Sequence, residues 1–204
     1  MRFVMTLATV AVAATAMAAV LQAQAGGGSA VELKVGDQAP DFTLQASDGN
    51  TYKLADFKGK QAVVLAWFPK ALTSGCTLEC KSLAEHGDLI RAYDVTYFMA
   101  SVDPLDKNIE FAKAKSVTLG QGANARVVEK KEADFPILSD PSKDTAKAYG
   151  VINDQYGFAN RWTFYIGKDG KILAIDKDVS KRVATSAEDM AAKLGELGVA
   201  KRSF

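Results

Sequence analysis

The two cysteines of this 204-residue chain, Cys76 and Cys80, lie four residues apart. An apolar run over residues 61–68 predicts a buried strand that ends at Pro69, and a mixed polar and apolar pattern predicts a helix over about 76–93. Cys76 therefore falls in the first helical turn. Unpaired backbone N–H groups and the positive end of the helix dipole favour thiolate over thiol there. Its position makes Cys76 a candidate nucleophile.

A structural disulfide is the simplest alternative use of the two cysteines. Four residues of an ideal helix separate two Cα atoms by about 6 Å, toward the upper end of the range that a disulfide accepts. A Cys76–Cys80 bond would therefore require local unwinding of the first turn, and a strained bond is easily reduced. A disulfide that closes so short a loop also constrains the unfolded chain little. The spacing favours a redox role over a structural one.

Two thiolates at this spacing would also suit a soft metal, as in Sco-like copper chaperones, if a histidine completed the site. His86, the one histidine of the chain, lies six residues beyond Cys80. That offset is about 9 Å along a helix and on another face, which disfavours a metal site. A thioredoxin-like thiol–disulfide oxidoreductase stays an alternative, although it would use cysteines separated by two residues.

The first 25 residues differ from the rest of the chain. A positive start, an apolar run and the small residues of Ala23-Gln24-Ala25 are typical of a cleaved secretory signal. We therefore predict a signal peptide at 1–25, a flexible leader at 26–32, and one domain over 33–204, located in the periplasm or secreted. An uncleaved membrane anchor is disfavoured because weakly hydrophobic alanine and threonine dominate the run.

The net charge of the chain bears on the classes of partner it could bind. Arg2 is the one charged residue of the predicted signal, so cleavage takes the formal net charge from +1 to zero. A neutral chain with interspersed signs gives no support for nucleic acid or for a stable association with a membrane after cleavage.

The remaining patterns alternate between strands and helices. Strands are predicted at 41–44, 51–54, 62–68, 95–102, 135–141, 161–166 and 171–175, and helices at 76–93, 109–115, 143–149 and 187–197. Residues 116–134 show no clear period and are predicted to be an insertion or a long loop. This order indicates an α/β domain with a central mixed sheet flanked by helices and an N-terminal β-hairpin. A strand that leads into a helix with cysteine chemistry points to the thioredoxin-like branch of that class.

Several segments resemble one family. The run Pro69-x-x-x-Thr73-x-x-Cys76 resembles the active-site pattern of peroxiredoxins, and its flanking residues are similar to those of the Q-type, bacterioferritin-comigratory-protein-like subgroup. Further similar segments follow the family order, at residues 35–44, 48–50, 57–60, 135–140 and 161–170. The resemblance covers about 33–197 and is interrupted by 116–134.

The resemblance implies a thiol-dependent peroxidase of antioxidant defence that reduces hydrogen peroxide and small organic hydroperoxides. It implies no metal, haem or flavin cofactor. An external thiol, from a thioredoxin-like protein or a small molecule, would be the reductant, and the protein would be a monomer or a weak dimer. Cys76 would be the peroxidatic thiolate that attacks a peroxide oxygen and becomes a sulfenic acid.

The resemblance also implies roles for residues around Cys76. Thr73 would place its hydroxyl beside the sulfur, although a simple N-cap role is the alternative. Arg161 would bring a guanidinium that favours the thiolate, and Pro69 would shape the loop and shield the sulfur. Glu79 resembles a family position, but we leave it out of the predicted site because an acidic residue also suits the first helical turn.

Cys80 departs from the subgroup pattern, in which a resolving cysteine on this helix usually lies five residues after the peroxidatic one. Cys80 either resolves the sulfenic acid of Cys76 within the chain, or an external thiol does so and the enzyme is a one-cysteine peroxidase. We favour Cys80 as the resolving residue.

Overall fold

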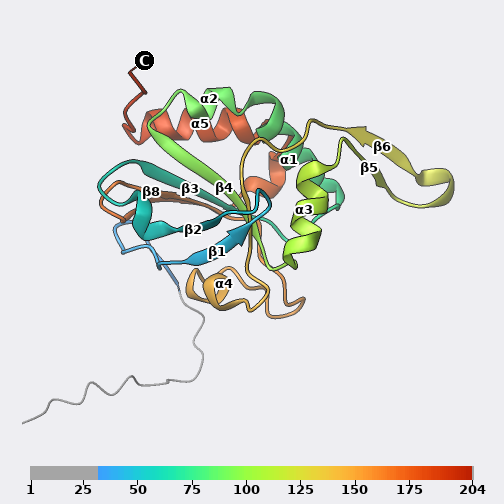
Figure 1. The fold of residues 1–204 in the computed structure, drawn as a ribbon, viewed down its shortest axis with the longest axis horizontal. Helices are drawn as coiled ribbons and strands as arrows, with labels where there is room; N and C mark the ends of the chain where they lie inside the picture. Colours follow the sequence, from blue (N-terminus) through green and yellow to red (C-terminus); the bar gives the residue numbers. More distant parts are fainter. Residues whose placement is uncertain (1–31, 204) are drawn as a thin grey trace, which may run out of the picture.

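A computed structural model describes residues 32–203, which form one mixed seven-stranded sheet and a separate two-stranded sheet (Figure 1). The strand order of the main sheet is β2-β1-β7-β4-β3-β8-β9, and the small sheet pairs β5 with β6. The predicted signal peptide at 1–25, and all but the last residue of the predicted leader at 26–32, lie outside the described residues.

The strands are β1 (Thr43–Ala46), β2 (Thr51–Lys53), β3 (Ala62–Trp67), β4 (Val95–Ser101), β5 (Ser116–Leu119), β6 (Arg126–Glu129), β7 (Ile137–Ser139), β8 (Thr163–Ile166) and β9 (Ile172–Asp176). The helices are α1 (Ser74–His86), α2 (Asp88–Arg91), α3 (Leu105–Lys113), α4 (Asp144–Ala148) and α5 (Ser186–Glu196). Four short 3-10 helices are η1 (Leu54–Phe57), η2 (Gly122–Asn124), η3 (Val179–Lys181) and η4 (Val183–Thr185).

Strand β3 forms the centre of the sheet because all six of its side chains are apolar and buried. It pairs in parallel with β4, from Ala62 opposite Val95 to Trp67 opposite Ala100, and antiparallel with β8. A strand that is buried on both faces needs a continuous apolar run rather than an alternating one.

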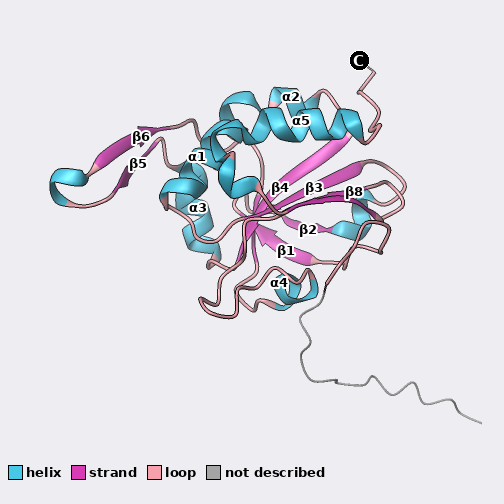
Figure 2. Cartoon of the chain, turned by 180° about the vertical axis from the view of Figure 1, so that it is seen from behind, coloured by secondary structure: helices cyan, strands magenta, loops and turns pink. Residues whose placement is uncertain are grey.

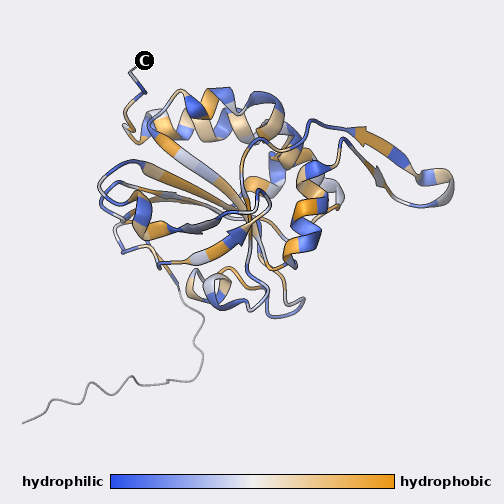
Figure 3. Cartoon of the chain, in the orientation of Figure 1, coloured by the Kyte–Doolittle hydropathy of each residue, from blue (hydrophilic) through white to orange (hydrophobic). Residues whose placement is uncertain are grey.

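Alternate side chains of β3 belong to two hydrophobic clusters, one on each face of the sheet. Val64 and Ala66 pack with residues of α1, α2, α3 and α5, whereas Val63, Leu65 and Trp67 pack with the β1–β2 hairpin and α4. Figures 1 and 2 show α1, α2 and α5 on one side of the sheet and α4 on the other. Apolar residues gather in the central strands, and polar residues mark the outer sides of the helices (Figure 3).

The predicted α/β, thioredoxin-like class with an N-terminal hairpin is confirmed, whereas the structure differs from two local predictions. The helix predicted over 76–93 is interrupted at Gly87, which packs against the Tyr97 hydroxyl, and the chain continues as the separate helix α2. Within residues 116–134, predicted to be an insertion or a long loop, residues 116–129 form the β5–β6 hairpin, so the long-loop alternative is wrong; the hairpin projects from the body of the domain (Figure 1). Its strands of four residues are too short to give a clear sequence period. Within residues 32–203, no helix is long and apolar enough to cross a membrane.

Candidate active site

The register of the sheet brings Arg161 to the cysteine helix across 85 positions of sequence. Ala66 on β3 pairs antiparallel with Thr163 on β8, and the Trp67 amide donates to the Trp162 carbonyl at 2.9 Å. Because the two strands are antiparallel, each residue further along β3 faces the residue one position earlier in the segment before β8. Arg161 therefore lies opposite Phe68, where the chain leaves the sheet toward α1. A site residue on a late strand is therefore positioned by backbone pairing.

The loop between β3 and α1 is held by contacts from neighbouring residues. The Ala71 amide donates to Oδ2 of Asp103, at 2.9 Å, and the Thr73 hydroxyl donates to the Lys70 carbonyl, also at 2.9 Å. Leu72 adopts the left-handed region with φ 64°, which is uncommon for a leucine. Such conformations persist where surrounding contacts fix the backbone, and they gather at functional sites.

Cys76 is the third residue of α1 and is fully buried. Nη2 of Arg161 donates to its sulfur at 3.0 Å. The guanidinium is itself largely buried, with 9% of the residue exposed, so water screens its charge weakly. An arginine that cannot lose its proton and a helix N-terminus both place positive charge beside the sulfur.

Glu79 is a site residue that the sequence prediction left out. It lies one helical turn beyond Cys76, is fully buried, and forms an ion pair with Nη1 of Arg161. Burial raises the pKa of the Glu79 carboxyl to about 7, and the nearby Arg161 opposes that rise. The same guanidinium therefore contacts a thiol and a carboxyl. The i, i+3 spacing from Cys76 was the available signal, because it places both side chains on one face of the helix.

Cys80 has different surroundings. It is fully buried in the cluster between α1 and the sheet, and burial raises the pKa of its thiol to about 12. The charge of Lys130, a residue directly after β6, partly offsets that rise in the pKa of Cys80. Both cysteines are free thiols in this structure.

The predicted positions of Thr73 and Pro69 are next to the site, and their chemical roles stay predictions. Thr73 occupies the N-cap position of α1, but its side chain makes no capping hydrogen bond. Its hydroxyl instead donates to the Lys70 carbonyl, which leaves the oxygen lone pairs available as acceptors. Pro69 is half-buried at the start of the loop. The structure brings Cys76, Glu79 and Arg161 into direct contact and leaves Thr73 at the exposed rim.

Residues 32–203 contain no cluster of three or more histidine, cysteine or acidic side chains that could hold a metal ion. His86 lies near the end of α1, where its Nδ1 is 3.9 Å from a carboxylate oxygen of Glu188.

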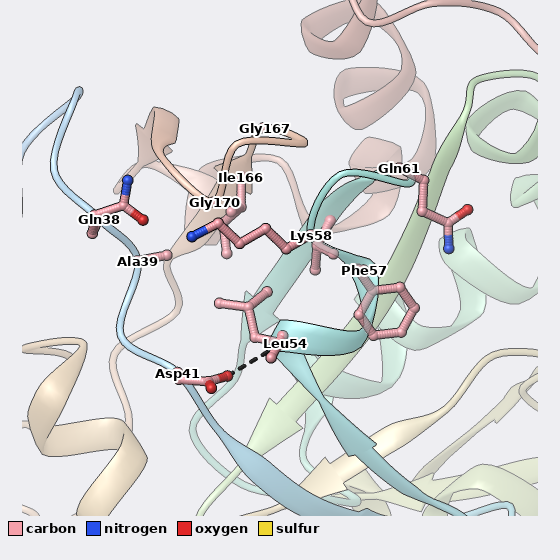
Figure 4. A pocket seen from close by; sticks show the side chains of 12 residues that line it. Gln38, Ala39, Asp41, Leu54, Phe57, Lys58, Gln61, Ile166, Gly167 and Gly170 are labelled. Atoms are coloured by element: carbon pink, nitrogen blue, oxygen red, sulfur yellow. Dashed lines mark hydrogen bonds between the residues drawn. The ribbon is translucent and has the colours of Figure 1, made fainter.

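A cavity of about 200 Å³ lies elsewhere in the molecule (Figure 4). Gln61, Val63 and Ile166 line it, which places it at the end of β3 opposite to the cysteine helix. None of the predicted site residues contributes to it. The chemistry of the cysteines is therefore separate from this cavity.

A thioredoxin-like sheet, a buried cysteine in the first turn of a helix and an arginine on its sulfur define a thiol-based redox enzyme of the peroxiredoxin class. The comparisons with known proteins agree. Residues 35–175 match the AhpC/TSA family, and the chain belongs to it.

Curated relatives place the chain within that family. It is 32% identical to peroxiredoxin Bcp of Escherichia coli K12 over 152 residues, which cover 72% of this chain and 86% of that protein. It is 33% identical to alkyl hydroperoxide reductase E of Mycobacterium bovis over 142 residues, which cover 69% and 82%.

Solved structures agree with the fold. Peroxidoxin BcpB of Mycobacterium tuberculosis superposes with a TM-score of 0.67 and 26% identity, over 84% of this chain and all of that one. The C47S mutant of Xylella fastidiosa PrxQ superposes with a TM-score of 0.63 and 23% identity, over 82% and 99%. The protein is a peroxiredoxin of the Q-type, Bcp-like subgroup.

Proposed function

We propose that this peroxiredoxin reduces hydrogen peroxide and small organic hydroperoxides through Cys76. The observation that carries the proposal is the 3.0 Å contact from Arg161 Nη2 to the Cys76 sulfur in a buried site. The thiolate attacks one peroxide oxygen, the O–O bond breaks, and the sulfur gains that oxygen as a sulfenic acid. The other oxygen leaves as water or an alcohol after it takes up a proton.

The surrounding groups have distinct roles in this proposal. The Arg161 guanidinium stabilises the negative charge that moves from sulfur to the departing oxygen. The Thr73 hydroxyl, already donating to Lys70, accepts a hydrogen bond from the peroxide O–H. Pro69 lacks an N–H donor and closes one side of the approach to the sulfur.

Cys80 then resolves the sulfenic acid and forms a disulfide with Cys76, which an external thiol reduces. Both cysteines lie within the continuous helix α1 in the reduced protein. Because helical geometry holds the two Cα atoms about 6 Å apart, disulfide formation requires the first turns of α1 to unwind.

We also propose that the protein is exported and acts as a monomer or weak dimer. The composition of residues 1–25 supports cleavage after Ala25. Mass spectrometry of the protein purified from its exported fraction tests this, and a mature chain that begins at Gly26 is expected. A chain that retains residues 1–25 would contradict export by this route.

The enzymatic proposal is tested by following peroxide consumption with a dithiol as reductant, beside the reduction of insulin disulfides without peroxide. We expect consumption of hydrogen peroxide and little insulin reduction. The reverse pattern would favour the thiol–disulfide oxidoreductase, and tight binding of Cu(I) by the reduced protein without peroxidase activity would favour the copper chaperone.

A further inference from the structure

Asp103 joins the loop between β3 and α1 to the rest of the domain. The Ala71 amide, in the middle of that loop, donates to Oδ2 of Asp103 at 2.9 Å. Within residues 32–203, no other backbone amide of residues 69–73 has a hydrogen-bond partner. The backbone amides of the loop are therefore attached to the domain through this one carboxylate.

Buried polar side chains hold Asp103 in place. The Ser101 hydroxyl, at the end of β4, donates to the same Oδ2 at 2.9 Å, and the Asp103 amide donates to Ser101 Oγ at 3.2 Å. Asn108 on α3 is fully buried, and its Nδ2 donates to Ser101 Oγ at 3.1 Å and to Ser139 Oγ on β7 at 2.8 Å. A satisfied network of this kind is rigid. The acceptor for the loop is thus fixed by β4, β7 and α3 together.

The carboxylate of Asp103 has no other use in the described part of the chain. None of the salt bridges within residues 32–203 includes it. Helix α3 begins shortly after Asp103, but Pro104 occupies its N-cap position, and the helix has no side-chain capping bond. The contacts of the carboxylate therefore point to the loop rather than to α3.

The bond lies directly before the left-handed residue of the loop. Leu72 has φ 64°, and Thr73 follows it at the N-cap of α1. A left-handed leucine costs free energy and persists only where neighbouring contacts hold it. Thr73 moves with α1, because its carbonyl accepts the Thr77 amide at 2.8 Å. Relaxation of Leu72 would therefore shift the first turn of α1, which carries Cys76, relative to Arg161.

We propose that Asp103 is a positioning residue that holds α1 in the arrangement in which Cys76 reacts with peroxide, an inference that rests on the proposed function. The first step requires the intact first turn, where Arg161 contacts the sulfur at 3.0 Å. The Cys76–Cys80 disulfide requires that turn to unwind. The bond from Ala71 to Asp103 favours the first arrangement and opposes the second, so its loss changes the rates of the two steps in opposite directions.

The test measures both steps in Asp103→Ala. Protein is mixed with one equivalent of hydrogen peroxide and quenched in acid at successive times, and mass spectrometry then measures the Cys76 sulfenic acid and the Cys76–Cys80 disulfide. Asp103→Asn is the conservative variant, because its side-chain oxygen can still accept both hydrogen bonds. Asp106→Ala is the matched control, because Asp106 is an exposed aspartate in the first turn of α3.

We expect the first oxidation to slow roughly threefold to tenfold in Asp103→Ala, and the conversion of sulfenic acid to disulfide to become faster by about the same factor. Asp103→Asn should be within about twofold of wild type in both steps, and Asp106→Ala should equal wild type. A merely structural role for Asp103 would lower the fraction of folded protein and slow both steps together.

Hydrogen exchange of the reduced wild type tests the bond without a variant. The Ala71 amide should exchange more slowly than the Leu72 amide, which has no partner within residues 32–203. Equal exchange of the two amides would overturn the inference. If Asp103→Ala fails to fold, Ser101→Ala replaces it, since it removes one of the bonds that hold the carboxylate, and smaller shifts in the same two directions are expected.

Rates in Asp103→Ala that equal those of wild type, or that fall in both steps, would overturn the inference and leave the peroxidase function intact. Asp103→Asn that behaves like Asp103→Ala would overturn it as well, because the acceptor oxygen would then not be the cause. Wild type that accumulates sulfenic acid without a disulfide would also overturn it and indicate a one-cysteine enzyme. Wild type that is not oxidised at Cys76 would contradict the proposed function itself.

Discussion

Cys76 and Cys80 are both buried and free on one helix, but their surroundings differ. An arginine donates to the first sulfur at 3.0 Å, whereas burial raises the pKa of the second thiol to about 12. Arginine keeps its charge at any ordinary pH, so the positive charge beside Cys76 does not depend on pH. Two thiols four residues apart on one helix can therefore suit different steps because their surroundings differ.

The largest effect is expected from Cys76→Ser. Peroxide consumption should fall about 1000-fold or more, because a serine hydroxyl does not ionise in this range and cannot replace the thiolate. Stopped-flow measurement of the reaction with hydrogen peroxide checks this. Cys80→Ser is the matched control and should keep the rate of the first oxidation. A Cys76→Ser protein that reacts with hydrogen peroxide at a rate within tenfold of wild type would contradict the assignment of the first oxidation to Cys76.

Arg161→Met should slow the first oxidation about 100-fold, since it removes the charge that stabilises both the thiolate and the departing oxygen. Arg161→Lys should recover only part of this loss, because an ammonium cannot contact Cys76 and Glu79 in the forked arrangement of a guanidinium. The second-order rate constant with peroxide is the measurement. Arg182→Met is the control, because Arg182 forms exposed ion pairs with Asp176 and Asp189. Equal rates for Arg161→Met and the control would contradict the account.

Glu79 gives a prediction about stability and pH. Burial raises the pKa of its carboxyl from the ordinary value of 4.5 to about 7 in the folded protein, so folding favours the protonated form. The contribution to stability is therefore fully present below about pH 4.5 and is lost as the pH rises to about 7. The free energy of unfolding of wild type, relative to Glu79→Gln, should fall across this window by an amount on the order of 1 kcal/mol or more.

Denaturant titrations of both proteins at several pH values measure this difference. A difference that stays constant from about pH 4 to pH 8 would show that folding leaves the pKa of Glu79 unchanged, and a difference that grows in favour of wild type would show that folding lowers it; either result contradicts the prediction.

Gly75→Ala should produce the smallest effect. A Cβ at this position would lie 3.1 Å from Nη2 of Arg161, so the guanidinium would have to shift by a few tenths of an ångström. We expect the first oxidation to slow roughly threefold to tenfold, with little change in the disulfide step, because the added methyl group would displace the guanidinium beside Cys76. Rapid-quench kinetics measures both steps. Ser74→Ala, at an exposed neighbouring position, serves as control, and equal kinetics in both variants would mean that Arg161 tolerates displacement.

The parts of the site that depend on local sequence patterns could be predicted from the sequence. The apolar run into β3 and the change of period after it placed Cys76 at a helix start, and the family resemblance indicated Arg161. The register of β3 with β8 explains why that distant arginine lies at the sulfur.

The features that the sequence did not predict depend on tertiary packing. Glu79 carries an i, i+3 signal, but the spacing alone does not show that the carboxyl is buried against Arg161. Lys130 lies in a segment of short strands without a clear period, and one lysine among several gives no sign that its amine is buried. Long-range burial, rather than local propensity, decides which charged side chains belong to the site.

The most direct test of the account is to locate the oxygen that one equivalent of hydrogen peroxide delivers to each single-cysteine variant. We predict that Cys80→Ser gains one oxygen at Cys76, and that Cys76→Ser remains unmodified at Cys80 over the same time, as judged by peptide mapping with mass spectrometry. Equal oxidation of the two cysteines, or preferential oxidation of Cys80, would contradict the assignment of the two thiols to different steps.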